Sequence, residues 1–145
     1  MAEDFQICEL EVGGGTLALC PLPVGRMADV SAWRPDLVLS LVEPHEMPAN
    51  LLSGHAVRQF PIPDFGIPSG DGWNAIESEC LAVLNGRGRV LAHCKGGCGR
   101  SGMAVLRIML AAGEADALAR LRAVRPCAVE TQEQLRWAQG GGGSL

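Results

Sequence analysis

The residues best suited to chemistry lie in one stretch, RVLAHCKGGCGRSGMAVL, residues 89–106. An apolar run leads directly into Cys94, and Arg100 and Ser101 precede a second apolar run. The segment between them is rich in glycine, at Gly96, Gly97 and Gly99. Glycines let a chain curl so that successive amides face one point, and the N-terminal amides of a following helix add the positive end of its dipole. The stretch therefore predicts an anion site with a cysteine at its base.

A phosphate ester is the anion that best explains this combination. Arg100 offers a planar fork of donors that matches two oxygens of a phosphate or sulfate. The amides, the helix dipole and Arg100 together favour the thiolate form of Cys94, which would make it a nucleophile at neutral pH. A thiolate in line with the ester bond attacks phosphorus and gives a cysteinyl-phosphate. Ser101 is then placed to donate a hydrogen bond to the sulfur, and Lys95 is expected at the rim of the loop.

The leaving oxygen needs a proton from a separate acid. His93 should alternate away from the loop, and we expect it to be a structural hydrogen-bond partner rather than an acid or base. The segment FPIPDFGIPSGDGW, residues 60–73, supplies Asp64 on a proline-stiffened loop, with Gly66 to permit lid motion. Asp64 is the first choice for the general acid and Asp71 the second.

The elements around this stretch alternate between strands and helices. Apolar alternation and Val/Leu runs predict strands at 4–12, 16–23, 36–43, 55–62 and 89–94, the first two forming a hairpin. Helical spacing predicts helices at 27–33, 101–113, 114–124 and 131–139 and a helix from 72 that stops at Asn85-Gly86, with helical turns at 46–54. The alternation favours a three-layer α/β fold, with a mostly parallel sheet flanked by helices. Trp73 and Trp137 are expected to pack rather than to bind substrate.

Length and composition indicate one domain. The chain has 145 residues and 48% hydrophobic residues, so residues 1–139 are expected to form a single domain and 140–145 a flexible glycine-rich tail. A net charge of −4 with scattered basic residues disfavours nucleic-acid binding. The N-terminus does not resemble a secretory signal, and the apolar runs are too short to cross a membrane. We expect a cytoplasmic monomer in which most of the six cysteines are free thiols.

The segment from His93 to Ser101 fits HCxxGxxR[ST] and resembles the active-site loop of the cysteine-dependent protein tyrosine phosphatases. The segments IPDFGIPSGD and VRPCAVETQEQ are similar to those of small atypical dual-specificity phosphatases, and the resemblance spans roughly residues 36 to 138. It implies a sheet of about four or five strands, no metal or cofactor, and hydrolysis of phosphotyrosine, with or without phosphoserine and phosphothreonine. The substrate would be a phosphorylated protein or a small phosphomonoester.

The resemblance also implies a role for each matching residue. Cys94 would be the nucleophile, Arg100 the phosphate clamp, Ser101 the thiolate-stabilising hydroxyl, and Asp64 the acid and then the base. Glu133 or Gln134 matches a position that orients water in some relatives. The phosphate-binding loop would consist of Lys95, Gly96, Gly97, Cys98, Gly99 and Arg100.

Cys98 departs from the family, whose members more often carry Leu or Phe at this position. It is expected either to pack or to act as a resolving thiol that captures oxidised Cys94. A zinc site built from His93, Cys94 and Cys98 is disfavoured, because Arg100 would repel the cation. Glu43 and His45 follow a predicted buried strand, so they lie either near the cleft or in a solvated loop.

Three other functions compete with a protein phosphatase. One is hydrolysis of a non-protein phosphate such as a phosphoinositide, which a second basic residue in the loop would have favoured. Another is a binding module that holds phosphorylated partners without turnover, which would have little need of Cys94, Arg100 and Asp64 together. The third is sulfur transfer by a persulfidated cysteine, which fits Arg100 and a distant acid less well.

Overall fold

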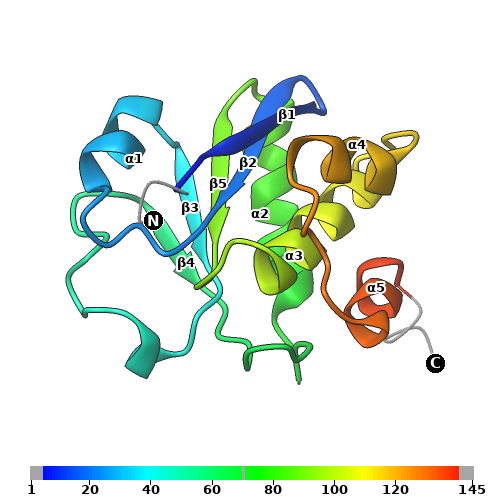
Figure 1. The fold of residues 1–145 in the computed structure, drawn as a ribbon. Coiled ribbons are helices and arrows are strands. Elements are labelled where there is room, and N and C mark those ends of the chain that lie inside the picture. Colours follow the sequence, from blue (N-terminus) through cyan, green and yellow to red (C-terminus); the bar gives the residue numbers. More distant parts are fainter. Residues whose placement is uncertain (1–4, 70, 141–145) are drawn as a thin grey trace.

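The computed structural model describes residues 5–69 and 71–140, and their fold is built around one sheet (Figure 1). The sheet has five strands in the order β1-β2-β5-β3-β4. These strands are β1 Cys8–Val12, β2 Gly15–Cys20, β3 Leu37–Ser40, β4 Val57–Gln59 and β5 Arg89–His93. Only β1 runs antiparallel to its neighbour, and the pairs β2–β5, β5–β3 and β3–β4 are parallel. The predicted α/β class with a mostly parallel sheet is confirmed.

Strands β1 and β2 form the predicted hairpin. The burial of β1 alternates from residue to residue, as expected for an edge strand with one face on the core. Gly13 and Gly14 make the turn with φ angles of 60° and 95°, which glycine adopts without the steric penalty of a β-carbon. The hairpin extends the sheet beyond β2 and leaves β5 central, where it is buried by neighbours on both sides.

The helices form two layers of unequal size. Helix α1, Met27–Trp33, covers one face of the sheet (Figure 1). Its Val30 packs there against Ala18, Cys20 and Leu91. The opposite face carries α2 Trp73–Asn85, α3 Gly99–Ala111, α4 Ala117–Val124 and α5 Gln132–Ala138 (Figure 1). Helix α3 is apolar almost all round because it lies against β2 and β5 and is covered by α4 and α5. This is the three-layer arrangement that the sequence predicted.

The expected helical turns at 46–54 are wrong in position. A single 3-10 turn, η2 Pro44–Glu46, lies at the start of this stretch, and residues 48–55 form a series of hydrogen-bonded turns rather than a helix. A capping box between Glu43 and Glu46 starts the turn. Met47 is extended because it precedes Pro48, and the residue before proline disfavours helical angles. Of the predicted tail, residues 141–145 lie outside the described residues.

Trp73 and Trp137 pack together as predicted. Their rings meet edge to face with centroids 5.0 Å apart, and the ring centroids of Phe60 and Trp73 are 5.5 Å apart.

Within the described part of the chain, no helix has both the length and the apolar character needed to cross a membrane.

The parallel strands end at the same edge of the sheet, and the chemically interesting residues follow them. Cys94 comes after β5, Glu43 after β3 and Phe60 after β4. Ligands of open parallel sheets bind outside the carboxyl ends of the strands, where neighbouring connections diverge. The fold therefore brings three loops together at this edge.

Candidate active site

Cys94 lies at the floor of a tight loop between β5 and the first turn of α3. The residue is 2% exposed. The Ser101 hydroxyl lies 3.2 Å from the Cys94 sulfur, and the Ser101 backbone N–H donates to the same sulfur at 3.4 Å. Both groups come from the start of α3, so the helix directs donors at the sulfur.

Gly97 makes the tight curl of the loop possible. Its φ is +73°, and a β-carbon there would lie 2.7 Å from the nitrogen of Pro21 and 2.8 Å from the carbonyl carbon of Cys20. The backbone N–H of Leu22 also donates to the carbonyl of Lys95 at 2.9 Å. The loop therefore lies directly against the residues that follow β2, with no room for a larger residue at 97.

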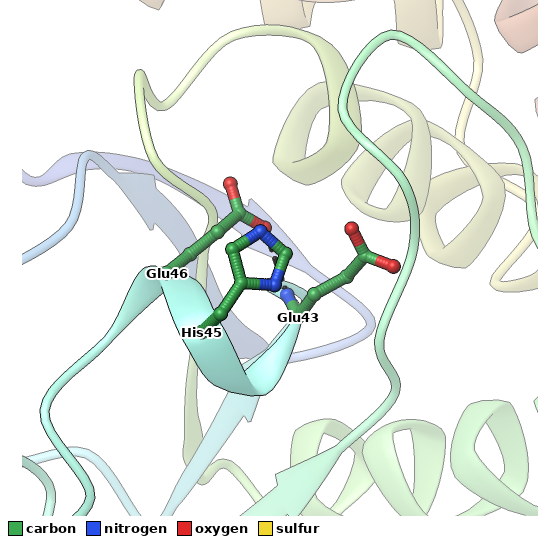
Figure 2. Close-up of side chains that lie close together, drawn as sticks. All are labelled: Glu43, His45 and Glu46. Atoms are coloured by element: carbon green, nitrogen blue, oxygen red, sulfur yellow. Dashed lines mark hydrogen bonds between the residues drawn. The ribbon is translucent and has the colours of Figure 1, made fainter.

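Arg100 is buried beneath the loop, with 1% of its side chain exposed. Nη1 and Nη2 donate to the two carboxylate oxygens of Glu46 at 2.7 and 3.0 Å, and Nη1 also donates to the carbonyl of Ile62 at 2.9 Å. Figure 2 shows Glu46 extending from η2 beside Glu43 and His45. The hydrogen bond from Arg100 lowers the pKa of Glu46 to about 2. Burial works to lower the pKa of Arg100, but the bond to Glu46 and nearby negative charge outweigh it and raise that pKa.

Sequence reasoning missed Glu46. It named Glu43 and His45 as the residues of this loop that could approach the cleft, whereas Glu46 makes the contact with Arg100. The available signal was that a buried arginine needs an anionic partner and that Glu46 closely follows the strand beside β5.

Asp64 lines the pocket above the loop, together with Cys94 and Arg100. One of its carboxylate oxygens lies 3.4 Å from Nη2 of Arg100 and accepts the Phe65 N–H at 3.0 Å. Its side chain is 52% exposed, so it faces the opening. The pocket has a volume of about 320 Å³ and is lined by Asp64, Phe65, Cys94, Lys95, Gly96, Cys98, Gly99, Arg100 and Glu130. Asp71, the second candidate acid, is exposed and does not line it.

His93 and Gln134 lie behind the pocket rather than in it. His93 is fully buried, and its Nδ1 donates to the carbonyl of Cys94 at 3.1 Å. Burial lowers the pKa of His93, which disfavours the protonated ring. Gln134 is also fully buried: its side chain accepts the Glu130 N–H at 2.9 Å and donates to the carbonyl of Gly66 at 3.1 Å. It thus ties the start of α5 to the loop that carries Asp64.

Glu133 is exposed and does not line the pocket, whereas Glu130 does. Sequence reasoning named Glu133 or Gln134 as the residue that orients water, and this role stays a prediction; it did not name Glu130, which lies before α5. The capping-box residue Thr131 marks where the helix begins and could have separated the two.

The sequence matches the family described as "Polymorphic toxin system, DSP-PTPase phosphatase" over residues 36–114. The structure of Tk-PTP in its active form is 34% identical and superposes with a TM-score of 0.76, covering 93% of this chain and 97% of that one. The chain belongs to the DSP-PTPase phosphatases. It is thus a cysteine-based phosphatase of the protein tyrosine and dual-specificity class.

More distant structures share the fold of this phosphatase. Kinase associated phosphatase, solved with its catalytic cysteine replaced by serine, is 20% identical with a TM-score of 0.80 and covers 97% of this chain and 98% of its own. Human DUSP28 is 18% identical with a TM-score of 0.72, covering 95% of this chain and 94% of that one. Comparison with curated proteins by sequence finds no match.

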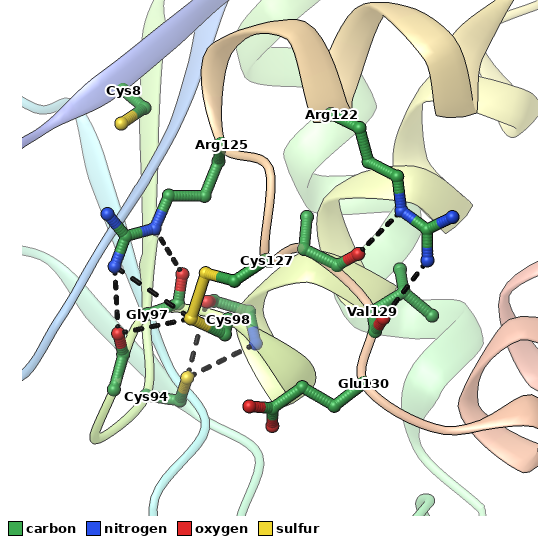
Figure 3. Close-up of a disulfide and its surroundings, with 12 residues drawn as sticks. Cys8, Cys94, Gly97, Cys98, Arg122, Arg125, Cys127, Val129 and Glu130 are labelled. Atoms are coloured by element: carbon green, nitrogen blue, oxygen red, sulfur yellow. Dashed lines mark hydrogen bonds between the residues drawn. A yellow bond between two sulfur atoms is a disulfide. The ribbon is translucent and has the colours of Figure 1, made fainter.

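Cys98 of the phosphatase has neither of the roles that the sequence suggested. It forms a disulfide with Cys127, 29 residues further along the chain (Figure 3). It is therefore neither a simple packing residue nor a thiol available to capture Cys94. Cys8, Cys20, Cys80 and Cys94 are free, so the expectation that most cysteines are thiols holds.

Two candidate metal sites can be assessed from the same geometry. The disulfide removes Cys98 as a thiolate ligand, so the disfavoured zinc set of His93, Cys94 and Cys98 is not formed. Ligand atoms of Glu43, His45 and Glu46 lie within 4.8 Å of one another (Figure 2). Both oxygens of Glu46 are bonded to Arg100, and this guanidinium would repel a cation there.

Proposed function

We propose that this phosphatase hydrolyses phosphotyrosine, and also phosphoserine and phosphothreonine, through a cysteinyl-phosphate intermediate. The observation that carries the proposal is that Cys94, Arg100 and Asp64 line one pocket although they come from two separate loops. A nucleophile, an anion clamp and an acid facing one volume are the groups that this reaction needs.

The phosphate would be bound by the loop amides and by Arg100. Glu46 occupies Nη1 and Nη2, whereas Nε is buried and has no partner among the described residues. We assign Nε as the guanidinium donor that a phosphate oxygen satisfies, with Nη2 as the second arm of the fork. The bonds to Glu46 then fix the plane of the guanidinium, and the two phosphate donors, Nε and Nη2, lie in this plane.

In the first step, the Cys94 sulfur attacks phosphorus and the bond from phosphorus to the ester oxygen breaks. Asp64 gives its proton to the leaving oxygen, which departs as an alcohol or phenol. In the second step, water attacks the phosphorus of the cysteinyl-phosphate and loses a proton to the Asp64 carboxylate. The sulfur leaves as a thiolate stabilised by the Ser101 hydroxyl, whose oxygen lies 3.2 Å away.

The alternatives carry less support. A phosphoinositide headgroup brings additional negative charges, yet the cationic Lys95 and Arg100 that line the pocket are matched by the acidic Asp64 and Glu130. A module that only binds phosphate would not need an acid in the same pocket as the cysteine. A sulfurtransferase would not need a proton donor for a leaving alkoxide.

We further propose that the phosphatase acts as a monomer in the cytoplasm, as expected from the sequence. A cytoplasmic location predicts that the Cys98–Cys127 disulfide is largely reduced in the cell, because cytosolic thiols are usually kept reduced. Light scattering of the purified chain tests the first statement. Alkylation of cysteines in intact cells, followed by peptide mapping, tests the second.

The reaction is tested with p-nitrophenyl phosphate and a panel of phosphotyrosine, phosphoserine and phosphothreonine peptides. Cys94→Ser should abolish turnover and keep phosphate binding, and residual activity above a few per cent would place the nucleophile elsewhere.

Asp64→Asn should slow hydrolysis of poor leaving groups by about 10²- to 10⁴-fold and flatten one limb of the pH profile. Asp71→Asn is the matched control, and an effect as large as that of Asp64→Asn would reassign the acid.

A further inference from the structure

Residues 125–129, the first part of the connection between α4 and α5, contact the phosphate loop from outside the pocket (Figure 3). We call residues 125–129 the clamp segment. It meets the loop at its middle, where Cys127 is covalently bonded to Cys98. Cys98 lines the pocket, whereas Cys127 and Arg125 do not. The clamp segment therefore acts on the pocket from behind the loop.

Arg125 holds two carbonyl groups of the phosphate loop. Its Nε donates to the carbonyl of Gly97 at 3.0 Å and its Nη2 to the carbonyl of Gly96 at 2.9 Å (Figure 3). In a trans peptide the C=O and the next N–H point in opposite directions. Carbonyls turned toward Arg125 therefore turn the amides of residues 97 and 98 away from it, which is the orientation that an anion-binding loop needs.

The backbone of the clamp segment packs closely on the loop and on the first turn of α3. The Val129 N–H donates to the carbonyl of Cys98 at 3.1 Å. A β-carbon at Gly102 would lie 2.6 Å from the Val129 nitrogen and 3.0 Å from Cα of Ala128. A small displacement of the clamp segment would therefore also displace the loop residues that carry the amides.

The cross-linked state is compatible with catalysis. The Cys94 sulfur remains a free thiol and keeps both of its contacts with Ser101. The phosphate loop contains three glycines, so its ordering costs more conformational entropy than that of an average segment. A covalent tie at Cys98 lowers this cost by restricting the loop before substrate arrives.

From these contacts we infer that the clamp segment is a positioning element for the phosphate loop and that its disulfide makes activity depend on oxidation. The pocket binds oxyanions best when Cys98 and Cys127 are joined. When they are two thiols, the fold persists but the loop amides are less well ordered. This inference rests on the proposed phosphatase reaction, because it concerns the same pocket.

The redox change is a simple two-electron exchange. Cys127 is exposed, so a dithiol reductant can attack the disulfide and release both cysteines as thiols while itself becoming a cyclic disulfide. In the reverse direction, a small disulfide such as oxidised glutathione accepts the two electrons and is released as two thiols. Reductants usually protect a nucleophilic cysteine and so preserve activity. Here we expect the opposite response, because reduction should lower activity.

The test compares the protein purified without reductant, before and after dithiothreitol, with peptide mapping to verify the Cys98–Cys127 bond. Assays use p-nitrophenyl phosphate, with inorganic phosphate and vanadate as inhibitors, well below the melting temperature of each form. We expect reduction to raise KM and both inhibition constants by about tenfold, with a smaller change in kcat. Cys127→Ser should reproduce these values and no longer respond to dithiothreitol, and Cys8→Ser, on β1, should respond like the wild type.

Arg125 provides a second measurement that leaves the disulfide in place. Arg125→Gln should weaken oxyanion inhibition, whereas Arg125→Lys should recover part of it by donating to one of the two carbonyls. Unchanged KM and inhibition constants in both the reduced protein and Cys127→Ser would overturn the inference, as would the absence of the bond under oxidised glutathione. Absence of turnover in every redox state would instead overturn the proposed function.

Discussion

Both carboxylate oxygens of Glu46 accept hydrogen bonds from the guanidinium of Arg100, at 2.7 and 3.0 Å, across 54 residues of sequence. The pair is almost completely buried, with side-chain exposures of 9% and 1%. A buried cation without a partner would be strongly unfavourable, and a bidentate partner also fixes the plane of the guanidinium. Glu46 thus determines how Arg100 is presented to an anion in the pocket.

Glu46→Gln should lower both stability and catalytic efficiency. The amide can accept only one of the two bonds, which leaves part of the Arg100 charge unpaired at a cost of about 3 kcal/mol. Loss of the fixed guanidinium plane should reduce kcat/KM on the order of 10- to 100-fold. Urea unfolding and steady-state assays measure the two effects.

The control for this substitution is Glu79→Gln. Glu79 also pairs with an arginine, Arg58, at 2.7 Å, but both side chains are substantially exposed. Exposed pairs contribute little, so Glu79→Gln should change stability by less than about 1 kcal/mol and leave kcat/KM unaltered. Equal effects of the two substitutions would show that the buried pair has no special role in presenting Arg100.

The same pair predicts a dependence of stability on pH. The pKa of Glu46 is lowered from 4.5 to about 2, so its stabilising contribution is complete above pH 4.5 and is lost as the pH falls toward 2. The difference in unfolding free energy between wild type and Glu46→Gln should therefore shrink between pH 5 and pH 2. Denaturant titrations across this range provide the measurement, and a difference independent of pH would contradict the pairing.

Gly97→Ala should disable the phosphate loop. The new β-carbon would lie 2.7 Å from the Pro21 nitrogen, and alanine is strained at a φ of +73°. The loop would have to shift, and a shift of about 1 Å in groups that position a substrate lowers kcat/KM roughly 100-fold. Gly96→Ala should cost far less, because nothing lies within 4 Å of a β-carbon there. Comparable losses in both variants would mean that close packing is not what requires Gly97.

Local patterns were sufficient to predict the core of the site. The Val/Leu run before Cys94, the glycines after it and the apolar run beyond Ser101 indicated a strand, a loop and a helix N-terminus, and the structure has β5, the loop and α3 in that order. Each signal acts over a few residues, because side-chain alternation, glycine torsion freedom and helix periodicity are properties of adjacent positions. For the same reason Asp64, on a loop stiffened by prolines, could be proposed as the acid.

Long-range partners could not be predicted in this way. Glu46 was missed because its partner Arg100 is 54 residues distant, and the two meet only after β3 and β5 have paired. Cys127 was missed because cysteine spacing does not specify which sulfurs pair. Cys94 is the cysteine nearest to Cys98 in the sequence, so it was considered as the partner instead. The turn at 44–46 depends on a capping box and two prolines, which compete with the weaker helical pattern that follows.

Alkylation of the native protein should distinguish the cysteines by their surroundings. Burial raises the pKa of Cys80 to about 12 and that of Cys20 further, so neither should react with iodoacetamide near neutral pH. Cys94 lines the pocket and should be modified, and inorganic phosphate or vanadate should protect it by occupying the loop above its sulfur. Cys98 and Cys127 should be labelled only after reduction. Peptide mapping reads out each site, and labelling of Cys94 that proceeds equally fast with saturating vanadate would refute an oxyanion site over the sulfur.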